Sequence, residues 1–232
     1  MRKLGHLASW GVAFGLVLPC AALADDQEII ERIYRHVSTF EERYPVSVAR
    51  RKMLVREIDP RSGEVRKTST SLQEIRTRVG EAPKIVILEC QIDGQDAEPR
   101  DCKRRENNRE PLYRIFGPKG RDHYRLELLA SEAPTPSAVY RLRVLPLAKT
   151  ERHFEGVLAF DAESLRLLSS RGSLADYPFG LKAFDLRIDF DEWEGKPVVA
   201  TTHLEMTLYF PLILNRQVIS QSVAFEQRLL AE

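Results

Sequence analysis

The sequence predicts a mainly β (α+β) domain: a highly curved antiparallel sheet, or half-barrel, with an N-terminal helix covering its concave face. Two observations support this fold class. One stretch near the N-terminus has its apolar residues at helical spacing, and the segments after it alternate apolar and polar side chains with a period of two. About nine to eleven such segments, joined mostly by short turns, are typical of an antiparallel meander with one face buried and the other in water.

The first 24 residues have the three parts of a secretory signal peptide. Arg2 and Lys3 form a basic start, an apolar run covers residues 7–18, and an A-x-A cleavage site lies at residues 22–24. The apolar run is shorter than the roughly 20 residues that a transmembrane helix needs. No later segment has such a run, so we expect an exported protein that does not span a membrane.

The expected organisation is a leader, residues 1–24, followed by a single domain, residues 25–232. Cys20 offers an alternative, in which the protein is a lipoprotein anchored through an acylated cysteine. Pro19 directly before Cys20 fits that processing site poorly, and we favour cleavage after Ala24.

The expected mature chain is close to neutral. The full sequence holds 35 basic and 34 acidic residues, and removal of Arg2 and Lys3 leaves 33 basic ones. A nucleic-acid-binding domain would show a basic excess, so we expect no nucleic-acid partner.

Two cysteines, Cys90 and Cys102, follow the leader. In an oxidising compartment an even pair of cysteines indicates a disulfide. The Asp93-Gly94 turn between them places the bridge at the base of an excursion between two strands. A redox or zinc site would need C-x-x-C spacing or further ligands nearby, and the sequence has neither.

Residues 26–43 form the predicted helix. Tyr44-Pro45 ends it, because the residue before a proline avoids the helical region. A single apolar stripe indicates one packed face, which we expect to lie on the sheet. The stripe consists of Ile29, Ile30, Ile33, Val37 and Phe40.

The period changes to two after the helix. Residues 46–58 and 64–70 form a predicted hairpin around the turn at 59–63. Residues 71–80 fit either a short helix or a strand, and the threonines and serines before them favour the strand. The apolar run at 85–90 predicts a buried strand.

The middle of the chain continues the meander. The basic run at 103–109 is expected to be a solvated loop, and turns are expected at 117–120 and 131–137. The predicted strands here are residues 113–116, 123–129, 139–145, 154–160 and 165–170.

The stretch FDLRIDFDEW, residues 184–193, sorts its side chains by face. Successive strand residues point to opposite faces, so the aspartates line a face in water and the large apolar groups line the other. A calcium loop would need an oxygen ligand and a glutamate where Trp193 and Ala200 stand, and we expect no metal. The apolar face carries Phe184, Leu186, Ile188 and Phe190, and the polar face carries Asp185, Arg187, Asp189 and Asp191.

The strand at 198–210 repeats this separation, and a final strand covers 213–229. His203 and Glu205 share its polar face, and we interpret them as a polar pair rather than as metal ligands. The candidate residues lining an apolar concavity are Phe184, Leu186, Ile188, Phe190, Leu204, Met206 and Leu208.

Catalytic signatures are missing from the sequence. It has no G-x-S-x-G elbow, no H-E-x-x-H and no P-loop. The histidines after the leader lie on different elements, so only the fold could bring them together. We therefore expect that the protein is not an enzyme, that it binds no cofactor and that it has no catalytic residue.

Two passages resemble the outer-membrane lipoprotein-sorting proteins of the LolA/LolB type and their periplasmic relatives. The first, VYRLRVLPLAKTERHFEGVLAFDAESLRLLSSRG, contains a G-x-hydrophobic-x-hydrophobic-Asp element at Gly156 to Asp161. The second, DLRIDFDEWEGKPVVATTHLEM, is similar to the next hairpin in the proteins of that group. The resemblance as a whole covers residues 110–228. The resemblance implies a periplasmic protein that holds lipid or lipoprotein acyl chains inside a curved sheet under helical covers. The chain differs from those carriers in having one clear helix.

Two functions from different classes follow. A lipid-binding protein would need an apolar concavity that is open, whereas the same residues would otherwise form a closed core without a ligand. An envelope sensor or adaptor that binds a protein partner would have a filled barrel and an exposed apolar patch or edge strand.

The leader makes the first testable prediction. The intact mass of the exported protein should correspond to a chain that begins at Asp25. A mass that corresponds to a chain beginning at an acylated Cys20 would replace this expectation with the lipoprotein alternative.

Overall fold

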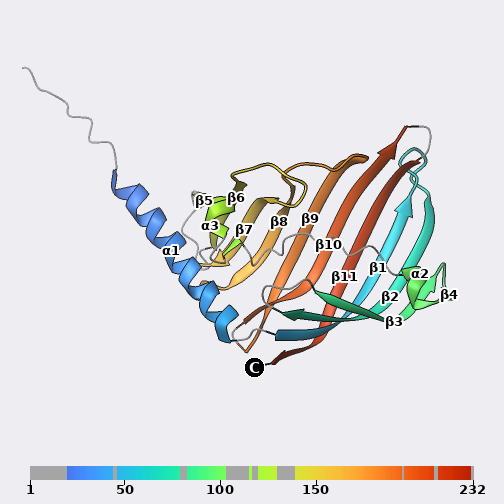
Figure 1. Cartoon of the computed structure of the whole chain (residues 1–232), viewed down its shortest axis with the longest axis horizontal. Helices are drawn as coiled ribbons and strands as arrows, with labels where there is room; N and C mark the ends of the chain where they lie inside the picture. The colour runs from blue at the N-terminus through green and yellow to red at the C-terminus, as the bar shows by residue number, and fades with distance from the viewer. Residues whose placement is uncertain are drawn as a thin grey trace, which may run out of the picture.

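The structure, a computed structural model, describes residues 20–43, 46–78, 83–102, 115–116, 120–129, 139–194, 196–211 and 214–230. Within them, eleven strands form one antiparallel sheet that curves into an open half-barrel, and the helix α1 (Cys20–Arg43) packs against part of it (Figure 1). The predicted fold class is confirmed. The strands are β1 (Val46–Ile58), β2 (Val65–Arg78), β3 (Lys84–Ile92), β4 (Gln95–Asp96), β5 (Tyr124–Leu129), β6 (Val139–Pro146), β7 (Phe154–Asp161), β8 (Leu167–Leu174), β9 (Leu181–Trp193), β10 (Lys196–Phe210) and β11 (Leu214–Leu230).

The order of the strands across the sheet is β4-β3-β2-β1-β11-β10-β9-β8-β7-β6-β5. Strands that lie side by side are therefore neighbours in sequence, except for β1 and β11, which pair inside the sheet, while β4 and β5 lie at its opposite edges. The two short helices α2 (Pro99–Cys102) and α3 (Gly120–His123) follow β4 and precede β5. No helix among the described residues is long and apolar enough to cross a membrane.

Most predicted elements are found, and two are corrected. Residues 71–78 continue β2, which confirms the strand favoured there. The run at 85–90 is a strand but not a buried one, because Val86 is 56% exposed and Leu88 is 42% exposed. The short β4 pairs only with the end of β3, so most of β3 lies at the edge of the sheet. Of the predicted strand at 113–116, residues 115–116 are described and form a turn with buried side chains.

Several other predicted segments lie outside the described residues. They are most of the leader, the loop at 103–109, most of the turn at 117–120 and the connection at 131–137. The domain boundary after residue 24 stays a prediction, and the helix that begins at Cys20 runs through it.

The helix α1 packs on the concave face over β6 and β7. Ile30, Ile33 and Tyr34 are buried against Leu142 and Val144 of β6 and against the apolar side chains of β7. Five of these side chains have no exposed surface at all: Ile33, Leu142, Val144, Leu158 and Phe160. The predicted cover by the N-terminal helix is confirmed for this part of the sheet.

A pair of glycines lets β7 and β8 approach an aromatic ring. Gly156 and Gly172 face one another across the two strands, and the ring of Phe154 lies over both. A Cβ atom added at Gly156 would stand 2.3 Å from the carbonyl oxygen of Arg171 and 2.5 Å from the Phe154 ring. This contact explains the glycine that begins the G-x-hydrophobic-x-hydrophobic-Asp element.

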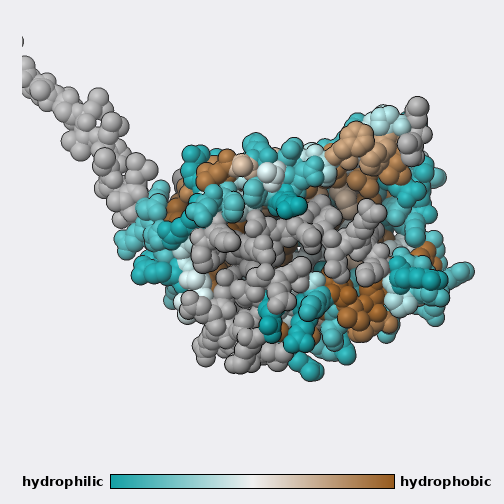
Figure 2. Space-filling model, viewed as in Figure 1, coloured by the Kyte–Doolittle hydropathy of each residue, from teal (hydrophilic) through white to brown (hydrophobic). Residues whose placement is uncertain are grey.

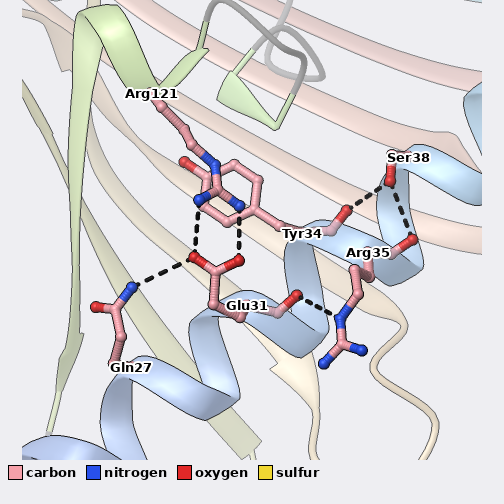
Figure 3. A network of polar contacts seen from close by, with 6 residues as sticks. All are labelled: Gln27, Glu31, Tyr34, Arg35, Ser38 and Arg121. Atoms are coloured by element: carbon pink, nitrogen blue, oxygen red, sulfur yellow. Dashed lines mark hydrogen bonds and ion pairs between the residues drawn. The ribbon is translucent and has the colours of Figure 1, made fainter.

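An ion pair fixes α1 to α3 (Figure 3). The Arg121 guanidinium donates to both carboxylate oxygens of Glu31, at 2.8 and 2.7 Å, and lies 4.2 Å from the centre of the Tyr34 ring. These hydrogen bonds hold the pKa of the Glu31 carboxyl below its ordinary value of 4.5. Because the pair is largely exposed, we expect it to contribute no more than about 1 kcal/mol.

The Glu31–Arg121 pair predicts a pH-dependent stability. A carboxyl with a lowered folded-state pKa stabilises the protein above its unfolded-state pKa and loses that contribution as pH falls through the folded-state value. Glu31→Gln should therefore lower the free energy of unfolding by up to about 1 kcal/mol at pH 7. The difference from wild type should vanish as pH falls below 4.5, the ordinary value for this carboxyl.

Urea unfolding at a series of pH values measures this effect. Glu28→Gln, an exposed position on the same helix, is the matched control and should stay close to wild type. A Glu31→Gln effect that is constant down to pH 3 would contradict the assignment.

Candidate functional site

The concave face can be followed across the sheet by its cross-strand pairs. Paired residues in antiparallel strands point to the same side, so one row of side chains runs from the face under α1 to the far edge. The row reads Leu142, Leu158, Ser170, Ile188, Thr202, Ser222, Met53, Ser71 and Cys90. Its side chains are mainly apolar up to β9 and mainly short and polar from β10 onward.

The predicted lining residues lie on the apolar part of this face, beyond the cover of α1. Phe184 is 5% exposed and forms a small core with Leu174 and Leu181. Packed against it, but only half-buried, are Leu186, Leu204, Met206 and Leu208. Ile188 and Phe190 are also half-buried on the same strand but do not join this cluster. The structure thus brings together five of the seven residues that the sequence suggested.

A cavity of about 310 Å³ lies where the apolar and polar parts of the concave face meet. Met206, Leu208 and Val218 form an apolar wall on β10 and β11. The opposite wall is polar and comes from β1, β2 and the α2 helix: Glu57, Lys67, Ser69, Asp101 and Cys102. Sequence reasoning found two of these eight residues and missed the polar wall, because no inward face had been assigned to the first hairpin.

Charged side chains of the concave face are partly paired. Arg216, which pairs with Leu208 across β10 and β11, reaches Glu57 on β1 with an N–O distance of 2.5 Å. Arg51, further along β1, donates to Gln73 Oε1 at 2.6 Å, and burial lowers the pKa of its guanidinium. Neither residue carries a recognisable motif in the sequence.

The α2 helix is held over the concave face by the predicted disulfide. Cys90 of β3 and Cys102 of α2 are bonded, with Cα atoms 5.8 Å apart, which confirms the pairing. The excursion turns at Asp93 and Gly94, both with positive φ, as an Asp-Gly hairpin turn requires. Because Cys102 and Asp101 line the cavity, this bridge positions part of its wall.

The aspartates of β9 lie on the outer face, as predicted. Asp189 is exposed and accepts a hydrogen bond from Thr201 Oγ1 at 2.6 Å, and Asp185 forms an ion pair with Arg187 at 2.9 Å. No three metal-ligating side chains gather in the part of the chain that the structure describes. Among the described residues, the acidic stretch is therefore a hydrated strand face.

The described histidines lie on separate elements, such as His203 on β10 and His123 on α3. His203 and Glu205 each contact a glutamine of β11, Gln221 and Gln217 respectively. The rings of His123 and His153 lie 5.5 Å apart, which the sequence alone could not indicate. His153 Nδ1 contacts the carbonyl oxygen of Ala148 at 2.8 Å, inside the turn that precedes β7. This contact stabilises the turn.

Apolar surface also reaches the outside of the molecule over β3 (Figure 2). The exposed side chains there are Val86 and Leu88, on the strand next to the short edge strand β4. The aromatic side chain of Phe179, in the loop before β9, is 86% exposed, and its ring lies 5.6 Å from that of Phe210.

Comparison with known proteins finds similarity in solved structures only. No described protein family and no curated protein matches the chain. A domain described as outer membrane lipoprotein-sorting, from Vibrio parahaemolyticus, is 12% identical, with 89% of this chain and 92% of that chain covered and a TM-score of 0.45. A LolA superfamily protein from Nitrosomonas europaea is also 12% identical, with 89% and 94% covered and a TM-score of 0.45.

A third similar structure is the Pseudomonas aeruginosa MucA/MucB complex, with 10% identity, 90% of this chain and 100% of that chain covered, and a TM-score of 0.27.

We expect the Cys90–Cys102 disulfide to stabilise the folded protein. Its loss should lower the free energy of unfolding by about 2–3 kcal/mol, the effect of releasing a loop of this length in the unfolded state. Chemical denaturation with and without dithiothreitol measures the difference. A variant with both Cys90→Ala and Cys102→Ala should not respond to the reductant, and an equal response in that variant would contradict the assignment.

Proposed function

We propose that the protein is exported to the periplasm and binds a lipid or lipoprotein acyl chain on the concave face of its half-barrel, without catalysing a reaction. The observation that supports this proposal is a contrast within one face of the sheet. Under α1, Leu142, Leu158 and Phe160 have no exposed surface, whereas Leu186, Leu204 and Met206 on the same face are only half-buried. A closed core without a ligand would bury both groups alike.

The cavity gives an acyl chain a place to enter. Its volume of about 310 Å³ falls within the range of small-molecule sites, roughly 300–1,000 Å³. Each methylene group removed from water contributes about 0.8 kcal/mol, so a chain laid along these side chains could supply most of the affinity. The remaining free energy must offset the loss of translational and conformational freedom on binding.

A second candidate function is supported by the edge of the sheet. Val86 and Leu88 are exposed on β3, and β4 covers only the end of that strand. An exposed apolar edge strand can accept a strand from a partner protein. An envelope adaptor that binds a protein through β3 would therefore fit this surface, and it would not need the cavity.

Native mass spectrometry of the exported protein, followed by organic extraction, tests the first proposal. We expect an added mass that is released on denaturation and that extraction identifies as phospholipid or acyl chain. Met206→Glu places a charge in the cavity wall and should abolish the added mass. Thr207→Glu, the next residue on the outer face of β10, should retain it.

The wild-type protein decides the proposal even if Met206→Glu does not fold. If the wild-type protein shows only its own mass, and takes up no lipid when phospholipid vesicles are added, lipid binding is contradicted. Attention would then pass to partners of β3, where Val86→Lys should reduce capture of an envelope protein.

A further inference from the structure

We propose that the concave face holds an anionic group on Arg51, so that the bound molecule is an anionic amphiphile rather than a neutral lipid. This inference rests on the proposed function and specifies its ligand class. It comes from a cation that the structure turns inward and leaves without a counter-charge among the described residues.

Arg51 points into the half-barrel. It pairs with Gln73 on β2 and Ala224 on β11, one step along the strand from the row that contains Met53 and Ser71. Its side chain donates to Gln73, which is 2% exposed and in turn donates to Ser71 Oγ at 2.8 Å. The neighbouring residue Arg50 is exposed and forms an ion pair with Glu226 at 3.0 Å.

The guanidinium of Arg51 is incompletely paired. Its Nε atom is inaccessible to solvent and has no hydrogen-bond partner, and the only bond described for this side chain is the one to Gln73. No carboxylate within ion-pair distance is found for it among the described residues. An arginine carries five N–H donors in a planar fork, so most of its capacity is unused.

A partly buried cation of this kind is unfavourable by itself. Removing a charge from water costs several kcal/mol unless an opposite charge and hydrogen bonds compensate for it. A carboxylate, sulfate or phosphate offers what Arg51 lacks, because two of its oxygens match the guanidinium fork. The short polar side chains around Arg51 suit such a group: Ser71 and Ser222 are buried on the adjacent row, on either side of Met53.

The position of Arg51 relative to the cavity fits an amphiphile. Glu57, which lines the cavity, lies six residues further along β1, or about 20 Å at the rise of an extended strand. Met53 and Val55 occupy the inward positions between them. A hydrocarbon chain whose charged end binds Arg51 would therefore run along these side chains toward the apolar wall of the cavity.

Two probes with the same chain test the inference. Laurate and 1-dodecanol each carry twelve carbons, but only laurate is charged at pH 7.4. Wild-type protein, freed of lipid, should bind laurate about tenfold more tightly than dodecanol, the ratio expected for one charge-assisted hydrogen bond. Arg51→Met should remove the preference while still binding dodecanol, and Arg50→Met should keep it. Competition against a fluorescent fatty acid gives both affinities.

Each result of this experiment is informative. Equal affinity of the wild type for the two probes, or a preference that persists in Arg51→Met, would overturn the inference and leave acyl-chain binding standing. If neither probe binds, the proposed function fails, and a second measurement decides about the anion alone. Inorganic phosphate should then raise the melting temperature of wild type and Arg50→Met but not of Arg51→Met; no such difference would overturn the anion site as well.

Discussion

The pairing of β1 with β11 is the constraint on which the rest of the molecule depends. It joins the first and last strands at the centre of the sheet and so connects the half that follows β1 with the half that ends in β11. Its register sets Met53 opposite Ser222 and Val55 opposite Ser220. A slip of one residue would turn every inward side chain of one half outward, and both the cavity and the Arg51 environment would be lost.

The helix α1 covers only part of the concave face, because its apolar stripe is narrower than the sheet. The apolar stripe of α1 is wide enough to bury the inner side chains of β6 and β7, where Leu142 and Leu158 are inaccessible. The inner side chains of β9 and β10 lie beyond that stripe and keep exposed surface, as Leu204 does. An open sheet that is covered unevenly therefore produces a closed core and an accessible apolar face from one continuous surface.

The sequence predicted the parts of this arrangement that local pattern determines. Proline at position 45 located the end of α1, and strict alternation located both faces of β9. Alternation does not say which strand lies at an edge, and so the apolar run in β3 was wrongly expected to be buried. The inward position of Arg51 was missed for a related reason. Arg50, Arg51 and Lys52 follow one another in β1, and only the register with β2 and β11 shows which of the three points inward.

The concave face changes from apolar to polar side chains, and this change links the kind of ligand that binds to the stability of the folded protein. The half-buried apolar side chains of β9 and β10 and the incompletely paired guanidinium of Arg51 are both unfavourable in the protein by itself, the first because they contact water and the second because it lacks a counter-charge among the described residues. A neutral chain would relieve the first and leave the second, while a small anion would do the reverse. Only a molecule with both parts removes both costs at once. A ligand that binds only the folded protein stabilises it by an amount that grows with the ratio of ligand concentration to Kd. On the proposed assignment, the concave face would therefore select for an amphiphile whose charged end binds Arg51 and whose chain runs along β1 toward the apolar wall of the cavity.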